Sequence, residues 1–193
     1  MAKGEQSRQR LIDCAAELFW KNGYAATGVS GILNAAGLPK GSFYFYFKSK
    51  DELALAVISN YQERILKQME AFSEDQTWDS FVLKLFLHLK ERAENSSIWG
   101  CPFAVMGMEF AFQKPEAAKI YLDAIKKFGA LFRRVLLQSG LSETHADILS
   151  ERLLALYQGN LLLGRISQDG TFLECAEKDM IQVCREYRTF YGV

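Results

Sequence analysis

The chain has few residues of the kinds that build metal centres, and it has no long apolar run. Its 193 residues include four cysteines without a CxxC pair and only two histidines. Metal-ligand spacing is therefore absent, and no metal or other cofactor is expected. No apolar run approaches the roughly 20 residues that a membrane span needs, and the polar stretch Lys3–Arg8 predicts no signal peptide. A cytoplasmic protein with reduced thiols is the simplest interpretation.

The formal net charge is also zero, but the charge is unevenly distributed along the chain. Residues 1–50 hold seven Lys or Arg against three Asp or Glu, whereas the remaining residues hold sixteen against twenty. A basic part joined to an acidic part fits a module that binds DNA phosphates, attached to something that does not. We therefore expect one domain over residues 1–50 and a second over residues 51–193.

Apolar residues recur at helical spacing along the chain, and the C-terminal half shows no strand-like alternation, so an all-α fold is predicted. Four helix starts carry N-cap signals: Thr27, the pair Ser49 and Glu52, Ser142, and the pair Thr171 and Glu174. Helices are predicted over residues 7–22, about 49–72, from 77 to about 96, about 115–139, about 142–167 and about 172–191.

Between the first two of these helices, residues 27–50 predict two further short helices joined by a tight turn. Ile32, Leu33 and Ala36 form the apolar face of the first of them, and Gly37 suits a left-handed C′ position. Pro39 disfavours helical geometry in the residue before it, so the helix must end there. Lys40-Gly41-Ser42 then opens the second short helix.

The second short helix carries five aromatic residues in a row, from Phe43 to Phe47. Phe43 and Phe47 lie four residues apart and are expected to face the core. The three rings between them must then spread over the other faces, next to Lys40, Lys48 and Lys50. Protruding rings flanked by lysines suit insertion into a DNA major groove. The alternative is a helical hairpin in which all the aromatics serve packing.

Residues 8–53 resemble the N-terminal signature of the TetR family of bacterial transcriptional regulators. The matching residues are Gly23, Tyr24, Ala26, Thr27, Ile32, Ala36, Gly37, Lys40, Gly41, Ser42, Tyr44, Phe47, Lys50 and Leu53. The resemblance implies a three-helix DNA-binding domain with a helix-turn-helix, followed by a helical domain for ligand binding and dimerisation. It also implies a homodimeric repressor that leaves a palindromic operator when a small effector binds.

Carried over by position, the resemblance also implies a set of DNA contacts. These are Thr27, Lys40, Gly41, Ser42, Tyr44, Phe45, Tyr46 and Lys50. The family often has a polar or hydroxylated ring at position 45 and a histidine at position 46. Phe45 and Tyr46 depart from that pattern, so they leave the base preference open.

The stretch from Trp99 to Phe112 is rich in aromatic and methionine residues, and Glu109 is its only charged residue. Such a stretch can line an apolar ligand pocket, or it can simply be the core of a helical bundle. The resemblance implies that it borders the effector cavity, for a small apolar or electrophilic effector. The expected effector-binding residues are Trp99, Cys101, Phe103, Met106, Phe110, Phe128 and Tyr157.

Cys101 lies between Gly100 and Pro102, at the expected start of a helix. Free N–H groups and the helix dipole at such a position favour a thiolate, and some TetR-like regulators that respond to electrophiles or oxidants look similar here. Cys101 is therefore a candidate redox sensor, with a buried inert thiol as the alternative. An enzyme that uses this thiol as nucleophile is a further class, but neither His88 nor His145 lies near it in sequence as a base.

The last two predicted helices carry more apolar residues than one core requires, including Leu161, Leu162, Leu163 and Ile166. A two-fold dimer that buries both helices against their copies in a four-helix bundle accounts for this excess. A monomer with a thick core is the alternative. A helical ligand carrier that does not bind DNA is also possible from composition, although the basic N-terminal part argues against it.

Overall fold

The computed structural model describes residues 3–95, 97–98 and 100–193 and shows helices and connecting turns in that part of the chain, without strands. The all-α prediction is confirmed. The chain divides into two compact units by packing. The first unit comprises the chain up to Ile65 together with Pro102–Asp123, and the second unit comprises Leu66–Cys101 together with Ala124–Val193. The functional boundary expected after residue 50 stays a prediction.

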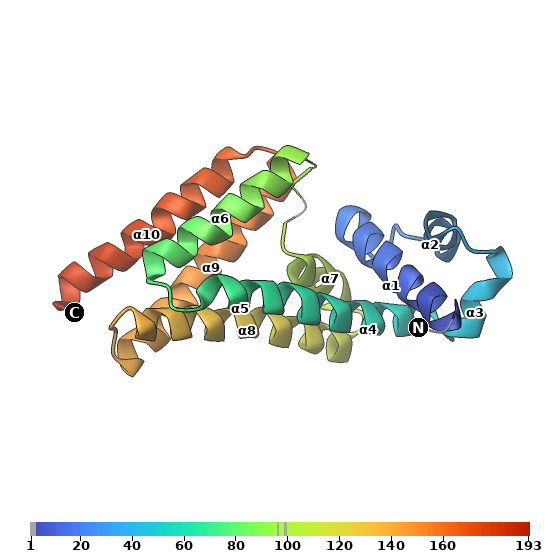
Figure 1. Ribbon diagram of the computed structural model, residues 1–193, viewed down its shortest axis with the longest axis horizontal. Coiled ribbons are helices and arrows are strands. Elements are labelled where there is room, and N and C mark those ends of the chain that lie inside the picture. Colours follow the sequence, from blue (N-terminus) through green and yellow to red (C-terminus); the bar gives the residue numbers. More distant parts are fainter. Residues whose placement is uncertain (1–2, 96, 99) are drawn as a thin grey trace. The chain divides into compact units, whose positions relative to one another are not determined.

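The first unit contains the N-terminal helices and a later helix that packs with them (Figure 1). Its elements are α1 (Lys3–Asn22), α2 (Val29–Ala36), the 3-10 turn η1 (Lys40–Ser42), α3 (Phe43–Tyr46), α4 (Lys50–Tyr61), α7 (Pro102–Phe110) and the start of α8 (Pro115–Gln138). Leu11, Phe19 and Leu53 are fully buried between α1 and its neighbours. The Tyr61 hydroxyl donates to the Ala16 carbonyl, which joins α4 to α1.

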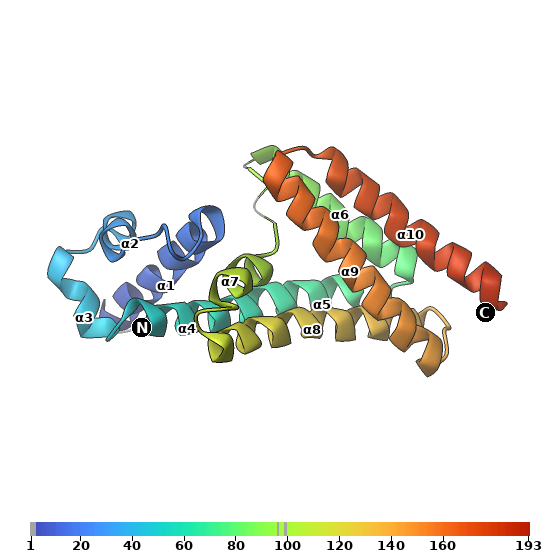
Figure 2. The same ribbon diagram turned by 180° about the vertical axis from the view of Figure 1, so that it is seen from behind.

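The second unit is built from the short helix α5 and several long helices. They are α5 (Lys67–Ser73), α6 (Trp78–Asn95), the remainder of α8, α9 (Glu143–Ser167) and α10 (Thr171–Tyr191). Helices α6, α9 and α10 run side by side in both views (Figures 1 and 2). Trp78 links α6 to α8 and α10, because its ring packs on Phe132 and its Nε1–H donates to the Met180 carbonyl at 2.9 Å.

The predicted helix limits agree with the structure within a few residues, with two exceptions. Helix α1 begins at Lys3 rather than residue 7. The helix expected to run unbroken over 49–72 contains a π-helical turn, η2 (Gln62–Leu66), between α4 and α5. Such a turn is a local expansion of the helical hydrogen-bond pattern, which apolar periodicity does not reveal.

Two of the four predicted N-cap positions are confirmed. Ser142 is the N-cap of α9, without a hydrogen bond from its side chain to the helix end. Ser49 is the N-cap of α4, and its hydroxyl accepts from the Glu52 N–H at 3.1 Å. Thr27 is not the N-cap of α2, because Gly28 occupies that position and the Thr27 hydroxyl donates to the Gly23 carbonyl at 2.7 Å. The cap expected at Thr171 is also wrong, since α10 begins at Thr171 itself with Gly170 as N-cap.

Candidate nucleic-acid interface

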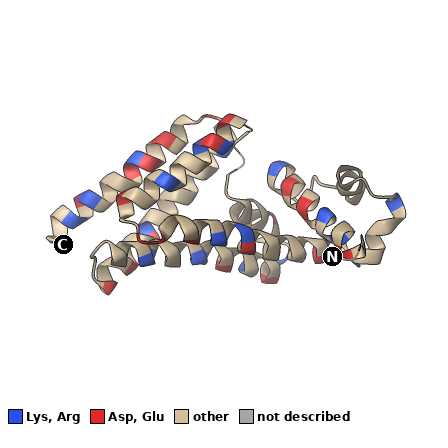
Figure 3. Ribbon diagram, viewed as in Figure 1, with Lys and Arg blue, Asp and Glu red and all other residues tan. Residues whose placement is uncertain are grey.

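Helices α2 and α3 form the expected helix-turn-helix. Ile32, Leu33 and Ala36 of α2 are buried, and Gly37 ends that helix in the left-handed conformation at φ 63°. Helix α2 carries no charged residue along its length (Figure 3). After Pro39 the chain makes one 3-10 turn, and the Ser42 hydroxyl donates to the Pro39 carbonyl at 2.7 Å. The turn therefore fixes where α3 begins.

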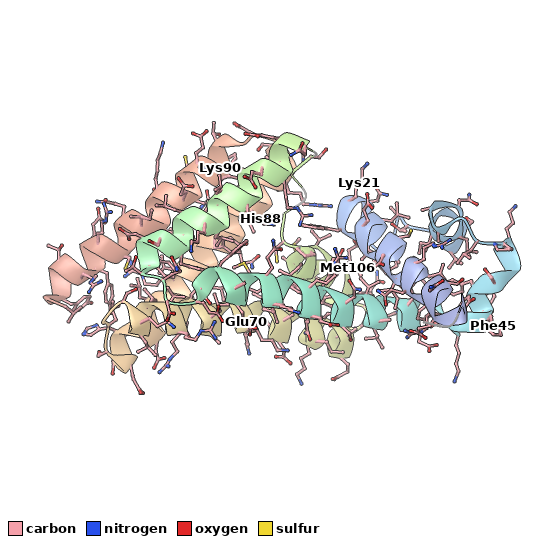
Figure 4. All side chains as sticks on the ribbon, in the orientation of Figure 1. Lys21, Phe45, Glu70, His88, Lys90 and Met106 are labelled. Atoms are coloured by element: carbon pink, nitrogen blue, oxygen red, sulfur yellow. The ribbon has the colours of Figure 1, made fainter. Side chains whose placement is uncertain are left out.

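The aromatic run of α3 divides between core and surface as its spacing predicts. Phe43 and Phe47 are buried, with ring centroids 6.0 Å apart. Tyr44 and Phe45 are 73% and 81% exposed, and Tyr46 is half-buried. Phe45 stands on the outer side of α3 (Figure 4). Because exposed aromatic rings are costly in water, this surface is suited to covering by a partner.

Among the lysines predicted near this surface, Lys40 and Lys48 are exposed, as is Gly41. Lys50 is half-buried and already engaged within the protein. Its ammonium donates to the carbonyls of Tyr24 and Thr27, at 2.9 and 3.1 Å. Lys50 therefore fixes the turn between α1 and α2, whatever further contact it makes.

Thr27 is the predicted DNA contact least available to a partner. Its side chain is buried, at 4% exposure, and its hydroxyl is directed to the Gly23 carbonyl. Thr27 therefore stabilises the turn between α1 and α2 through this hydrogen bond.

Arg8 and Asp51 make further charged contacts in the first unit. The Arg8 guanidinium lies 5.0 Å from the centre of the Phe47 ring. Asp51, at the start of α4, accepts a hydrogen bond from the Tyr24 hydroxyl and pairs with Lys114 at 2.5 Å. Lys114 and the Tyr24 hydroxyl together lower the pKa of Asp51. Burial, followed by the neighbouring Asp51, raises the pKa of Tyr24.

The predicted effector residues fall into both units. Phe103, Met106 and Phe110 of α7 are buried in the first unit. The Phe110 ring stacks on Tyr121 at 5.6 Å, and Met106 is labelled on α7 in Figure 4. Within this unit these side chains are core residues, and a role in effector binding stays a prediction.

The other predicted effector residues belong to the second unit, except that Trp99 lies outside the described residues. Cys101, Phe128 and Tyr157 are all buried. The Tyr157 ring lies 6.4 Å from Phe128 and 5.7 Å from Phe132, and burial raises its pKa. Next to Tyr157, both amide atoms of Gln158 are buried without a hydrogen-bond partner. A buried unpaired amide is costly unless a water or a ligand binds it.

Two family models match this chain. The first, described as bacterial regulatory proteins of the tetR family, covers residues 11–57, which include the whole helix-turn-helix. The second, the C-terminal domain of LmrA/YxaF-like transcriptional regulators, covers residues 81–179. The chain belongs to the TetR family of bacterial transcriptional regulators. It is therefore a DNA-binding transcriptional regulator rather than an enzyme.

Individual relatives support the TetR assignment over most of the chain. HTH-type transcriptional regulator YxaF of Bacillus subtilis is 29% identical over 176 residues, which are 89% of this chain and 91% of the relative. LmrA of the same species is 28% identical over 170 residues, which are 86% of this chain and 89% of LmrA. A TetR regulator from Chloroflexus aurantiacus superposes with a TM-score of 0.78 at 28% identity, covering 98% and 97% of the two chains.

No helix in the described part of this TetR-family chain is both long and apolar enough to cross a membrane. The same residues hold no cluster of three His, Cys, Asp or Glu that could bind a metal ion.

Proposed function

We propose that this regulator is a homodimeric repressor that binds a palindromic operator and leaves it when a small effector binds to its C-terminal domain. The exposed rings of Tyr44 and Phe45, next to Lys40 and Lys48, carry the DNA-binding part of this proposal. Lysines and tyrosine hydroxyls can contact phosphates, while ring edges meet base edges and thymine methyl groups. The protein would act in the cytoplasm, where the DNA lies.

Helix α9 supports the dimeric state. Leu162, Leu163 and Ile166 are 40%, 47% and 72% exposed, and Ile148 is 48% exposed near the other end of the helix. Gly159 lies on the same exposed side, with no side chain to hold a copy away. A second copy packed on α9 and α10 would cover these side chains, and two-fold symmetry would present two α3 helices to successive half-sites.

Repression is supported by two relatives. The mycobacterial DhaR is described as a transcriptional repressor and is 25% identical over 167 residues, and the Escherichia coli repressor NemR is 27% identical over 99 residues. A structural neighbour is the reduced form of NemR, with a TM-score of 0.76.

The effector part of the proposal rests on the apolar surroundings of Tyr157 in the second unit. In the following residue of α9, the buried and unpaired amide of Gln158 offers one donor group and one acceptor to a small molecule. Cys101 supplies a thiol for an electrophilic effector. It is buried, so a reagent must be small and apolar or must enter when the unit opens.

The proposal is tested by selecting duplexes from a random DNA library with the wild-type protein. The expected result is a palindrome whose half-sites lie about 10 bp, one helical turn, apart, or a multiple of it. Recovery of only unrelated duplexes, or of a single unrepeated half-site, would contradict the proposal.

A further inference from the structure

The turn between α1 and α2 is held by a carboxylate from a distant part of the chain. Glu109 of α7 accepts from the N–H of Tyr24 through Oε1 and from the N–H of Ala25 through Oε2, both at 2.7 Å. Two successive N–H groups that point to one side form a site for an anion. Hydrogen bonds to a charged carboxylate are shorter and stronger than those between neutral groups.

The same turn is held from a second helix by the opposite charge. The Lys50 ammonium of α4 donates to the carbonyls of Tyr24 and Thr27, and it lies 4.0 Å from the centre of the Tyr24 ring. The carboxylate therefore binds the donors of the turn and the ammonium binds its acceptors. We call Glu109, Lys50 and the turn residues 23–27 that they hold the turn clamp.

Gly23 leaves the space that the turn clamp requires. Its φ is +88°, a conformation that residues with a side chain rarely adopt. A Cβ at this position would lie 2.4 Å from Glu109 Oε1, far inside van der Waals contact. The glycine is thus needed both for the backbone conformation and for the approach of the carboxylate.

Packing around Tyr24 adds an apolar contact to the same helix. Its ring centroid lies 4.7 Å from that of Phe110, the residue after Glu109, and 5.3 Å from that of Phe19 in α1. Helix α7 therefore contacts the turn through two neighbouring residues, one charged and one aromatic.

We propose that Glu109 is a positioning residue for DNA binding, which holds the α1–α2 turn so that α2 and α3 are presented in the orientation that the operator requires. The inference rests on the DNA-binding function and adds a residue outside the helix-turn-helix to it. Since a helix moves as a rigid rod, displacement of α7 breaks two hydrogen bonds to the turn at once. Operator affinity then falls because the free protein no longer holds the binding-competent conformation.

The negative charge of Glu109 allows its positioning role to be distinguished from a direct contact with DNA. Removing a carboxylate lowers the negative charge of the protein, so electrostatics alone would leave DNA affinity unchanged or raise it. A loss of affinity in a Glu109 variant must therefore come from positioning. Loss of a phosphate contact would also lower the slope of log K against log salt concentration by about 1. Loss of a positioning contact would leave that slope unchanged.

The test compares full-length Glu109→Ala and Glu109→Gln with the wild type, using the duplex that the wild type selects from a random library. Amide hydrogen exchange at Tyr24 and Ala25 is measured by NMR, and Kd is measured over a series of salt concentrations. For Glu109→Ala we expect both amides to exchange at least about tenfold faster and Kd to rise about tenfold, with an unchanged salt slope. Glu109→Gln keeps one acceptor oxygen, so intermediate values are expected.

Glu116→Gln is the matched control, because it removes an exposed carboxylate of the same unit near the start of α8. It is expected to change neither quantity. Unchanged exchange at Tyr24 and Ala25 in Glu109→Ala would overturn the proposal, as would faster exchange with an unchanged Kd. A wild-type protein that selects no duplex would instead overturn the proposed operator binding, and the two failures are thereby distinguished.

Discussion

Helices α3 and α9 both expose apolar side chains, but the two surfaces differ in chemistry. On α3 the exposed residues are aromatic, one of the two carries a hydroxyl, and Lys40 and Lys48 flank them. On α9 they are aliphatic and are accompanied by Gly159. Rings with lysines suit a polyanion that has stacked bases, whereas branched aliphatic side chains suit another helix. The surroundings of an apolar residue, more than its exposure, therefore indicate its partner.

The interiors of the two units differ in a related way. In the first unit, charged side chains from α4 and α7 hold a short turn by hydrogen bonds to its backbone. In the second unit, aromatic rings join long helices, such as Trp78 and Phe81 of α6 against Phe132 of α8. A short turn has little apolar surface of its own to bury, so directed hydrogen bonds to its backbone fix its geometry.

The largest effect is expected from charging the α9 surface. Leu162→Glu with Ile166→Glu should give a monomer in light scattering, and operator affinity should fall by about a thousandfold, to the non-specific level, because a monomer reads one half-site. Leu87→Glu is the control, since Leu87 is 59% exposed on α6. If Leu87→Glu alone gave the monomer, the interface would lie on α6 and the comparison would fail.

Removing the exposed rings of α3 should weaken DNA binding without changing the dimer or the fold. Tyr44→Ala with Phe45→Ala is expected to weaken operator binding by about a hundredfold, because each good base contact contributes about 1–3 kcal/mol. The dimer and the helical content should not change, as checked by light scattering and circular dichroism. Phe112→Ala, which removes a 97% exposed ring outside α3, should leave Kd unaltered. Retained tight binding in the double variant would refute the assignment of α3.

Alkylation of Cys101, in the second unit, should cause the protein to release DNA. With N-ethylmaleimide, wild-type operator affinity is expected to fall by about tenfold, a usual size for coupling between two sites. Cys175 is exposed, so Cys175→Ser should keep the response while Cys101→Ser loses it. Site-resolved mass spectrometry identifies the modified thiol. Unchanged release in Cys101→Ser would eliminate the sensing role.

The lysines beside α3 should contribute through phosphate charge. Lys48→Ala is expected to raise Kd only severalfold at moderate salt and to lower the slope of log K against log salt by about 1. Lys126→Ala removes an exposed lysine of the second unit and should leave the slope as it is. Equal slopes for the wild type and Lys48→Ala would mean that Lys48 does not approach a phosphate.

The smallest effect is expected at Asp51, whose pKa is lowered by Lys114 and Tyr24. A lowered pKa in the folded state stabilises the protein above the usual carboxyl value near 3.8, and this contribution is lost as pH falls through the lowered pKa. Asp51→Asn should therefore lower Tm slightly at pH 7 and less at pH 3. Asp123→Asn, which changes an exposed carboxylate of the same unit, serves as the control. An equal loss of Tm at both pH values would show that the ion pair is not the cause.

The sequence pattern is enough to predict most helix limits, the turn at Gly37, the cap at Ser49 and the exposed rings of α3. All of these follow from residues within one or two helical turns of one another, so spacing and cap chemistry are enough to predict them. The DNA-binding function could also be predicted from the family signature. That signature lies in one continuous stretch of the chain, so it is recognisable without the fold.

The groups that hold the α1–α2 turn are known only from the folded structure. Glu109 lies 85 residues from Tyr24 in the chain, and its one visible signal was that it is the single charge in an apolar stretch. Thr27 was expected at a cap and Lys50 at DNA, yet the carbonyls of the turn take hydrogen bonds from both. Spacing in the sequence predicts the local geometry of each side chain. The hydrogen-bond partner of a polar side chain such as Glu109 or Lys50 depends instead on which backbone groups the fold brings within reach.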